Sequence, residues 1–348
     1  IPIIRQSLFA VFSIIFSLCF LSFAIVMALG GSPKNSTLEV AIFQYALFDL
    51  NFNKAVILSF IQIIICIIFV FIGFYKFKGS NFFEIGSIKY KHPHKNKILI
   101  KLIDYFLIVL FSFFLFSPVI LIYSEFLNSI FFEIKLTFTF IHAFINSILI
   151  SLSTGVVVSI FGLLISYLLV INHKNFLLQQ LLFLTSSMIL IISPIIFSLG
   201  YFIFFQPIIH YSYLKFFLVI LINVIFLLPF AILIFFNNLK NLYLNFNDFR
   251  KTYRIELFSY IKIIFPLLKN NFLYVFSFST VITLGDFTII SFFRSENFET
   301  LPSYLFKLIS TYQFNEASFV AGTILFISMV IYFIIDNFNY QGRPDITT

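Results

Sequence analysis

The sequence contains no tryptophan, only two cysteines and few charged residues, and it lacks the short motifs that mark enzymes. Among 348 residues, 10% are charged, and Cys19 and Cys66 stand alone in apolar stretches. Their spacing fits neither a disulfide framework nor a metal site. No phosphate-binding loop and no HExxH, CxxC or nucleophile-elbow motif occurs. The sequence therefore predicts no enzymatic activity, and no cofactor or metal is expected.

Apolar residues dominate the chain and fall into long runs. They make up 61% of the sequence, with 56 phenylalanines and a mean hydropathy of +1.06. A water-soluble domain cannot bury this much apolar surface, whereas a bilayer is itself apolar. A spanning helix needs about 20 apolar residues, and its backbone satisfies its own hydrogen bonds in lipid. We therefore predict an all-α polytopic bundle of about eight transmembrane helices, at residues 7–29, 55–75, 102–123, 141–171, 181–205, 216–237, 271–293 and 316–337.

Basic residues are unevenly distributed among the segments between these runs. If residue 1 is cytoplasmic, 16 of the 22 lysines and arginines lie inside. Cytoplasmic segments of membrane proteins are enriched in these residues, so both ends of the chain are expected in the cytoplasm. This orientation accounts for the formal charge of +8, and no nucleic-acid partner is predicted.

Two stretches of the sequence resemble each other at a nearly constant offset. IPIIRQSLFAVF at 1–12 matches FPLLKNNFLYVF at 265–276. Each copy reads as a proline, a helix, a polar outside loop with a Thr-Leu segment, and a second helix. This order indicates an internal duplication of the kind common in transporters, with chance similarity of apolar helices as the alternative. With a slip of one residue after the second pair, the matching positions are Pro2 and Pro266, Val11 and Val275, Thr37 and Thr300, and Phe43 and Phe306.

The duplication predicts the domain organisation. Residues 1–75 are expected to be the last two transmembrane helices of a first half, and 102–348 a second half with six transmembrane helices. Residues 76–101 are basic, polar and interrupted by glycine and proline, which predicts a cytoplasmic linker. Because the chain begins at Ile1 without a methionine, we expect it to be truncated at its N-terminus, with further spans before this residue.

The cytoplasmic segment 238–270 mixes charged and aromatic residues at helical spacing. Tyr253, Leu257 and Ile261 recur every four residues. A short amphipathic helix of this kind fits a membrane surface or a groove on a partner. Pro266 is then expected to start the next span, where its missing N–H costs little.

With its following proline, this segment resembles the coupling loop of permease subunits of ATP-binding-cassette importers. The glycine that this family has before the proline is replaced here, at Tyr253 or Arg254. Two flanking blocks resemble the ends of the two halves of the thiamine/thiamine pyrophosphate importer permease family. They are SFAIVMALGGSPKNSTLEVAIFQYALFDLNFNKA at 22–55 and ITLGDFTIISFFRSENFETLPSYLFKLISTYQFNEA at 282–317. The resemblance covers essentially the whole chain.

The resemblance implies a type I importer permease with duplicated halves in the bacterial inner membrane. It implies a path for thiamine or thiamine phosphates, which a periplasmic binding protein delivers, and a cytoplasmic ATPase dimer as a second partner. The alternatives are a permease for ferric ion or another small solute, and a degenerate membrane relic that does not transport. Coupling to the ATPase is expected at Tyr253, Arg254, Glu256, Leu257, Phe258 and Ile261.

Five residues are predicted to lie on the translocation path or at its gate: Gly285, Asp286, Phe287, Pro194 and Pro229. Asp286 interrupts an apolar run, and a charge in mid-bilayer is costly unless it faces water or the bundle interior. The alternatives for Asp286 are attraction of a cationic substrate, a bond to a neighbouring helix, and a place near the outer interface. Gly285 permits close approach of helices, and the two prolines are expected inside spans, which they would kink.

Overall fold

The structure of the protein is a computed structural model that describes residues 2–29, 36–75, 98–131, 137–171, 191–209, 211–252, 257–295 and 298–340. Within these ranges the chain is almost entirely helical and forms no strand, apart from an isolated bridge between Ser295 and Phe298. The helices are α1 (Pro2–Phe20), α2 (Ala24–Leu29), α3 (Leu38–Leu47), α4 (Phe52–Tyr75), α5 (Ile98–Phe131), α6 (Phe138–Ile171), α8 (Pro194–Phe205), the short 3₁₀ helix η2 (Gln206–Ile208), α9 (Ser212–Thr252), α10 (Leu257–Leu284), α11 (Ile290–Phe293), α12 (Leu301–Ser310) and α13 (Phe314–Tyr340).

Five helices among the described residues are long and apolar enough to cross a membrane. Each of the five coincides with one of the predicted spans. The prediction of a helical membrane fold is therefore confirmed. The apolar stretches are Phe52–Ile72 in α4, Lys101–Asn128 in α5, Phe138–Ile171 in α6, Ser212–Leu242 in α9 and Phe314–Ile335 in α13.

Two of the predicted spans are interrupted, so the prediction of one continuous helix is wrong for each. The run 7–29 breaks after Phe20 and resumes as α2. The run 271–293 belongs to α10, which ends at Leu284, and to the separate turn α11. Hydropathy averaged over a run does not reveal these breaks, because one serine after α1 or one aspartate after α10 leaves each run apolar on average.

Helix α6 packs along both α9 and α10 through small residues on its surface. A methyl group added to Gly162 would come within 2.7 Å of the Cβ atom of Ala231 on α9. A methyl group on Gly155 would collide with the side chain of Thr280 on α10. Small residues allow helix backbones to approach closely where lipid supplies no hydrophobic driving force between helices. These glycines therefore allow α6 to pack closely against α9 and α10.

Buried hydroxyl groups on α6 find hydrogen-bond acceptors on helix backbones. Ser159 Oγ donates to the carbonyl oxygen of Gly155 at 2.6 Å, and Ser166 Oγ donates to that of Gly162 at 2.6 Å. Ser166 Oγ also lies 3.3 Å from the carbonyl oxygen of Ile232 on α9. Such back-bonding removes the penalty of an unsatisfied polar group inside an apolar bundle.

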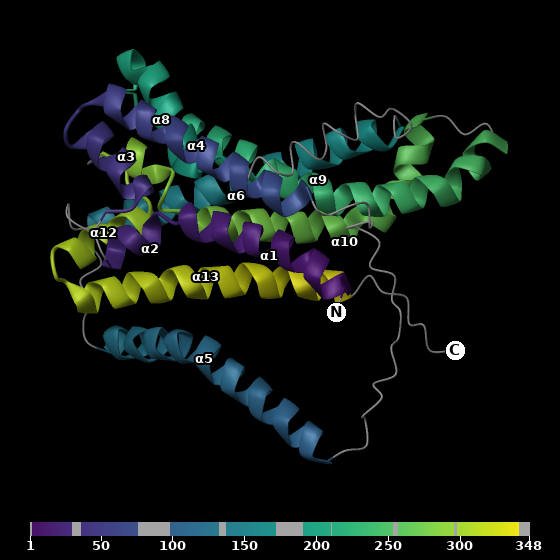
Figure 1. The fold of residues 1–348 in the computed structure, drawn as a ribbon, viewed down its shortest axis with the longest axis horizontal. Helices are drawn as coiled ribbons and strands as arrows, with labels where there is room; N and C mark the ends of the chain where they lie inside the picture. The colour runs from purple at the N-terminus through teal and green to yellow at the C-terminus, as the bar shows by residue number, and fades with distance from the viewer. Residues whose placement is uncertain are drawn as a thin grey trace.

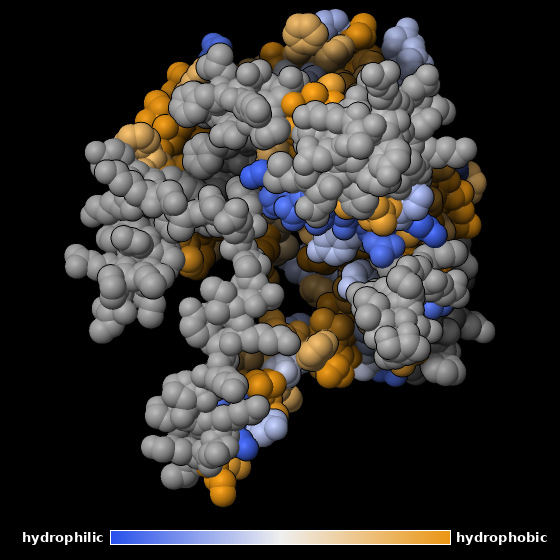
Figure 2. All heavy atoms as spheres, turned by 90° about the vertical axis from the view of Figure 1, so that its right-hand side faces the viewer, coloured by the Kyte–Doolittle hydropathy of each residue, from blue (hydrophilic) through white to orange (hydrophobic). Residues whose placement is uncertain are grey.

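The short helices and the tips of the longest helices lie at opposite ends of the molecule. Helices α2, α3, α8 and α12 gather at one end (Figure 1). At the other end lie the C-terminal part of α9, the start of α10, the start of α1 and the end of α13 (Figure 1). Figure 2 looks onto this second end and shows hydrophilic side chains near its centre, with hydrophobic ones at the sides. The described parts of the segment 238–270 lie here.

The two stretches that match in sequence have the same order of structural elements. In the first, α1 breaks into α2, and α3 and α4 form a helical hairpin; in the second, α10, α11, α12 and α13 follow the same order. Each hairpin turn contains a residue with positive φ, Leu50 at 51° and Tyr312 at 61°. Each of these residues lies two positions before the next helix. Positive φ is uncommon outside glycine, so the shared conformation supports an internal duplication.

Candidate functional site

The breaks after α1 and α10 bring two phenylalanines into contact. Phe23 follows α1, Phe287 follows α10, and their rings stack with centroids 5.8 Å apart and planes 5° apart. The two residues are 264 positions apart, the same offset that relates Pro2 to Pro266. Both rings are buried, with exposed fractions of 2% and 8%. The candidate site is built around this pair of equivalent residues.

Further phenylalanines extend the pair on both sides, and we call the four residues Phe43, Phe23, Phe287 and Phe306 the aromatic row. The ring centroids of Phe43 and Phe23 are 5.1 Å apart. Those of Phe306 and Phe287 are 4.7 Å apart. Phe43 and Phe306 are themselves matched in the sequence repeat, so matched residues flank the central stack, with ring planes at 55° on one side and 29° on the other.

The surroundings of the aromatic row differ between its two ends. Phe292 packs edge-on against Phe43, with centroids 5.5 Å apart and planes at 89°. At the same offset of 264 positions, the residue equivalent to Phe292 is Ala28. Ala28 lines a cavity of about 300 Å³ beside Phe306, and among the described lining residues the only aromatic rings are those of Phe287 and Phe306 themselves. The cavity is also lined by Ala24, Ile122, Gly285, Phe287, Pro302, Leu305, Ile309, Ala321, Ile324 and Leu325.

Asp286 makes its hydrogen bonds to the backbone next to it. Its Oδ1 accepts a bond from the N–H of Thr288 at 3.0 Å, and its Oδ2 accepts one from the N–H of Ile289 at 3.2 Å. Two backbone donors satisfy the carboxylate and fix the turn between α10 and α11. These bonds make Asp286 a structural acid of its own turn, and they do not run to a neighbouring helix as one of the alternatives had it. The turn also places Phe287, the next residue, in the aromatic row.

The two prolines predicted to kink spans have different positions in the structure. Pro194 is the first residue of α8, and Ser193 Oγ before it accepts a hydrogen bond from the N–H of Ile196 at 3.3 Å. The prediction of a kink at Pro194 is therefore wrong, because a proline in the first turn after a serine cap costs no helical hydrogen bond. Pro229 does lie inside α9. The predicted span 181–205 is described only from residue 191 onward.

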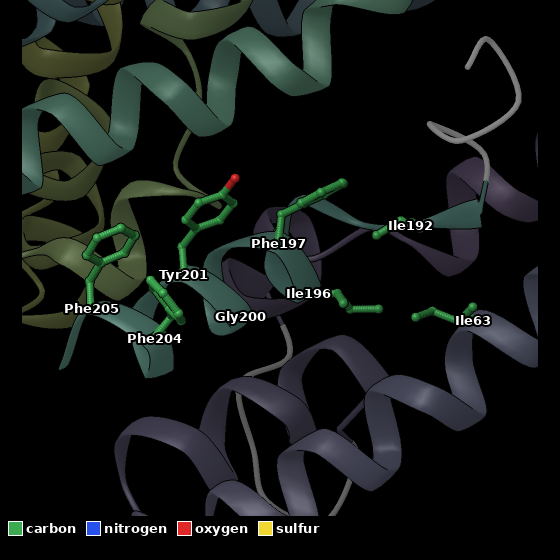
Figure 3. A pocket seen from close by; sticks show the side chains of 8 residues that line it. All are labelled: Ile63, Ile192, Ile196, Phe197, Gly200, Tyr201, Phe204 and Phe205. Carbon is green, nitrogen blue, oxygen red and sulfur yellow. The ribbon is translucent and has the colours of Figure 1, made fainter. Parts of the chain in front are cut away.

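A second cavity, of about 460 Å³, lies between α8 and α4. Figure 3 shows the rings of Phe197, Tyr201, Phe204 and Phe205 around Gly200. The Tyr201 hydroxyl is the only polar side-chain group among the residues drawn there. Such a lining suits lipid chains or an apolar helix, and it offers little to hold a charged solute.

The predicted coupling residues lie where α9 ends and α10 begins. Tyr253, Arg254 and Glu256 fall outside the described residues, whereas Leu257, Phe258 and Ile261 lie in the first turns of α10. The prediction of a separate short amphipathic helix is wrong for the described part. Residues 238–252 extend α9, and 257–270 extend α10.

Pro266 lies inside α10, so the prediction that it starts a span is also wrong. The helix begins nine residues earlier, at Leu257. An interior proline removes one hydrogen bond from the helical ladder, which a long helix packed against neighbours tolerates.

Sequence reasoning missed Glu39, an acid on α3 that is fully buried. Its Oε1 accepts a hydrogen bond from Gln62 Nε2 on α4, and the Ser193 side chain is a further hydrogen-bonding neighbour. Among the described residues, neither Glu39 Oε2 nor Gln62 Oε1 has a partner. Burial raises the pKa of this carboxyl group to about 7, because removal from water disfavours its charged form. The available signal was a lone acid in an apolar stretch.

Phe23 was also missed, although the sequence contained a signal for it. Extending the offset of the first matching block by eleven residues pairs Phe23 with Phe287. Within the ranges that the structure describes, no three His, Cys, Asp or Glu side chains come together as a metal site would need.

Comparisons with known proteins show similarity along nearly the whole chain. No family model matches the sequence. The chain is 28% identical to the thiamine transport system permease protein ThiP of Haemophilus influenzae over 99% of its own length. It is 27% identical to ThiP of Salmonella typhimurium and 26% identical to ThiP of Escherichia coli, each over 96% of its length. The predicted resemblance to thiamine importer permeases is therefore confirmed.

The chain spans less than two thirds of these relatives. It covers 64% of the Haemophilus influenzae protein and 63% of each of the other two.

Proposed function

We propose that the chain forms the translocation path of an ATP-binding-cassette importer for thiamine or thiamine phosphates. The observation that carries this proposal is the similarity to thiamine transport permeases, which extends over 92 to 99% of the chain in the relatives compared. The helical bundle with five candidate spans among the described residues is the architecture that such a subunit needs.

Energy for transport comes, in this proposal, from a partner chain. The sequence has no phosphate-binding loop, so a cytoplasmic ATPase dimer supplies ATP hydrolysis. Coupling takes place at the end of the molecule where α9 ends at Thr252 and α10 begins at Leu257. The contact residues proposed there are Tyr253, Arg254, Glu256, Leu257, Phe258 and Ile261.

The opposite end of the molecule is proposed to face the periplasm. Helices α3 and α12 occupy equivalent places in the two repeat copies at this end (Figure 1). They offer a surface against which a periplasmic binding protein can release its cargo. Residues 1–75 then belong to a first permease half and 102–348 to a second half, with rocking of the halves opening the path alternately to each side.

Uptake measurements test the proposal and separate it from the alternatives. A bacterial strain deleted for this gene is complemented with the intact gene, and uptake of labelled thiamine and of labelled ferric ion is measured in parallel. We expect the gene to restore thiamine uptake without changing iron uptake.

Restored iron uptake with no change in thiamine uptake would contradict the proposal and favour a ferric-ion permease. Restoration of neither, with the protein present in the membrane, would indicate a chain that does not transport. A control strain that carries the gene with an inactive partner ATPase separates active uptake from leak.

A further inference from the structure

We propose that Phe23 and Phe287 form the gate that closes the translocation path, and that the gate opens when the Phe287 ring moves into the cavity beside Phe306. The inference rests on the proposed function, because a gate needs a path. It adds the residues that close the path, the direction in which they open it, and the chemical class of cargo that they favour, a flat aromatic cation.

The position of the pair follows from the repeat. Phe23 and Phe287 are equivalent residues, and their rings are in contact. Two equivalent residues that touch each other must lie on the pseudo-two-fold axis that relates the copies, as in a symmetric dimer interface. Phe43 and Phe306, which are also matched in the repeat, flank this pair on opposite sides. Duplicated transporters place their path at the interface between repeats, where this axis lies.

The two rings are in contact and buried at this position in the structure. The planes of the two rings are within 5° of parallel. Only 2% of Phe23 and 8% of Phe287 is exposed. Both residues lie on short connections between helices, Phe23 between α1 and α2 and Phe287 between α10 and α11. Movement of either ring therefore breaks no long helix.

The cavity gives the gate a direction of opening. On the side of Phe43, the ring of Phe292 fills the space next to the row. On the side of Phe306, the equivalent position is Ala28, and a cavity of about 300 Å³ remains there. Phe287 itself lines this cavity. Each central ring packs against its flanking phenylalanine, so the cavity is what distinguishes them: Phe287 has space beside it, whereas Phe292 occupies the space next to Phe43.

The chemistry of the gate selects its cargo. Phenylalanine faces attract cations through their quadrupole and stack on flat rings. A flat aromatic cation that enters between Phe23 and Phe287 separates the two rings, and it stacks on both of them in place of their contact with each other. A solute with neither a flat ring nor a positive charge gains none of these contacts.

Substitution of Ala28 by phenylalanine tests the direction of opening. Ala28→Phe fills the cavity with the ring that Phe292 supplies on the other side. In the intact importer reconstituted into liposomes with its binding protein and ATPase, we expect uptake of labelled thiamine to fall to background while the protein assembles normally. Uptake at the wild-type rate would overturn the proposed opening movement.

Removal of a gate ring tests closure. In Phe287→Ala and Phe23→Ala, we expect the leak of labelled N-methylpyridinium from loaded liposomes without ATP to rise about tenfold, since one aromatic contact is worth up to about a tenfold change in equilibrium. Phe16→Ala is the matched control, because the Phe16 ring stacks on that of Phe69, with centroids 3.8 Å apart, inside the first repeat copy and not between the copies. A leak no greater than in this control would overturn the gate.

The two proposals fail separately. Because the leak assay needs no thiamine, it tests whether Phe23 and Phe287 close the path even if the wild-type protein carries a different solute. It also tests this closure if the Ala28→Phe protein fails to accumulate. Absence of thiamine uptake by the wild-type importer would overturn the proposed substrate alone.

Discussion

Glu39 shows how a single buried carboxyl group links the first helical hairpin to α8. It lies on α3, outside the predicted spans, and faces Gln62 and Cys66 of α4 and Ser193 before α8. None of these neighbours carries a positive charge that would compensate an ionised carboxylate. When it is protonated, the carboxyl group of Glu39 can donate a hydrogen bond. Its partner Gln62 also carries an acceptor without a hydrogen bond, Oε1, among the described residues.

The raised pKa of Glu39 makes stability depend on pH. The carboxyl pKa is about 7 in the folded protein and 4.5 in the unfolded chain, so between these values the folded state binds more protons. Stability is therefore fully present below pH 4.5 and falls as pH rises through 7, by on the order of 3 kcal/mol in total.

Replacement of Glu39 by glutamine removes this dependence. In Glu39→Gln, we expect the thermal midpoint in detergent to stay nearly constant between pH 5 and pH 8, and to exceed the wild-type midpoint at pH 8. The measurement is a set of thermal unfolding curves across this pH range. A wild-type slope retained in the variant would assign the pH dependence to another group.

At the scale of elements, small residues decide how the central helices pack. Gly162 on α6 contacts Ala231 on α9 so closely that a side chain has no space. Gly200 on α8 is the opposite case, since a methyl group there would meet no heavy atom within 4 Å. Both glycines lie inside helices, so the pair separates the effect of packing from that of helix propensity.

Enlargement of Gly162 is expected to disrupt the contact between α6 and α9. Gly162→Ala should lower stability by about 1–3 kcal/mol, because the added methyl group forces the backbones apart. The matched control Gly200→Ala should be neutral or up to about 1 kcal/mol more stable, because alanine is the better helix former. Denaturant unfolding in detergent measures both. Equal stability of the two variants would show that the α6–α9 contact yields without cost.

The sequence predicted the helices better than their ends. Continuous apolar runs are sufficient to locate α4, α5, α6, α9 and α13, because only helices satisfy their backbone in lipid. The helix end at Leu284 depends instead on the two hydrogen bonds of Asp286, which hydropathy does not report. The role of Pro194 likewise depends on the serine before it.

The candidate site was only partly predictable, because its contacts join distant positions. Phe287 was predicted at the path, but its partner Phe23 becomes visible only when the repeat offset is extended through an apolar segment. Glu39 and Gln62 are 23 positions apart on two helices, and nothing in their spacing predicts the pair.

For the whole molecule, the arrangement of the two ends predicts which surface each aqueous compartment meets. The hairpin turn at Tyr312 lies at the end with α3 and α12, and Tyr312 is 81% exposed. Asn241 is exposed on α9, toward the other end. With the orientation proposed above, these two residues face the periplasm and the cytoplasm respectively.

Cysteine labelling measures this orientation. In a chain whose native Cys19 and Cys66 are replaced by alanine, we expect Tyr312→Cys to react with a membrane-impermeant maleimide added to spheroplasts. Asn241→Cys should react only after the membrane is permeabilised. The reverse pattern would invert the orientation and remove the proposed site of coupling to a cytoplasmic ATPase.

The difference between Ala28 and Phe292 has a consequence for how such a protein evolves. In a dimer of identical subunits every substitution appears on both sides of the axis. A single chain that carries both copies is free of this constraint, so one copy can keep an empty space while the other fills it. Substitutions around Ala28 can then adapt the cavity to a new cargo without changing the packing of Phe292 on the other side.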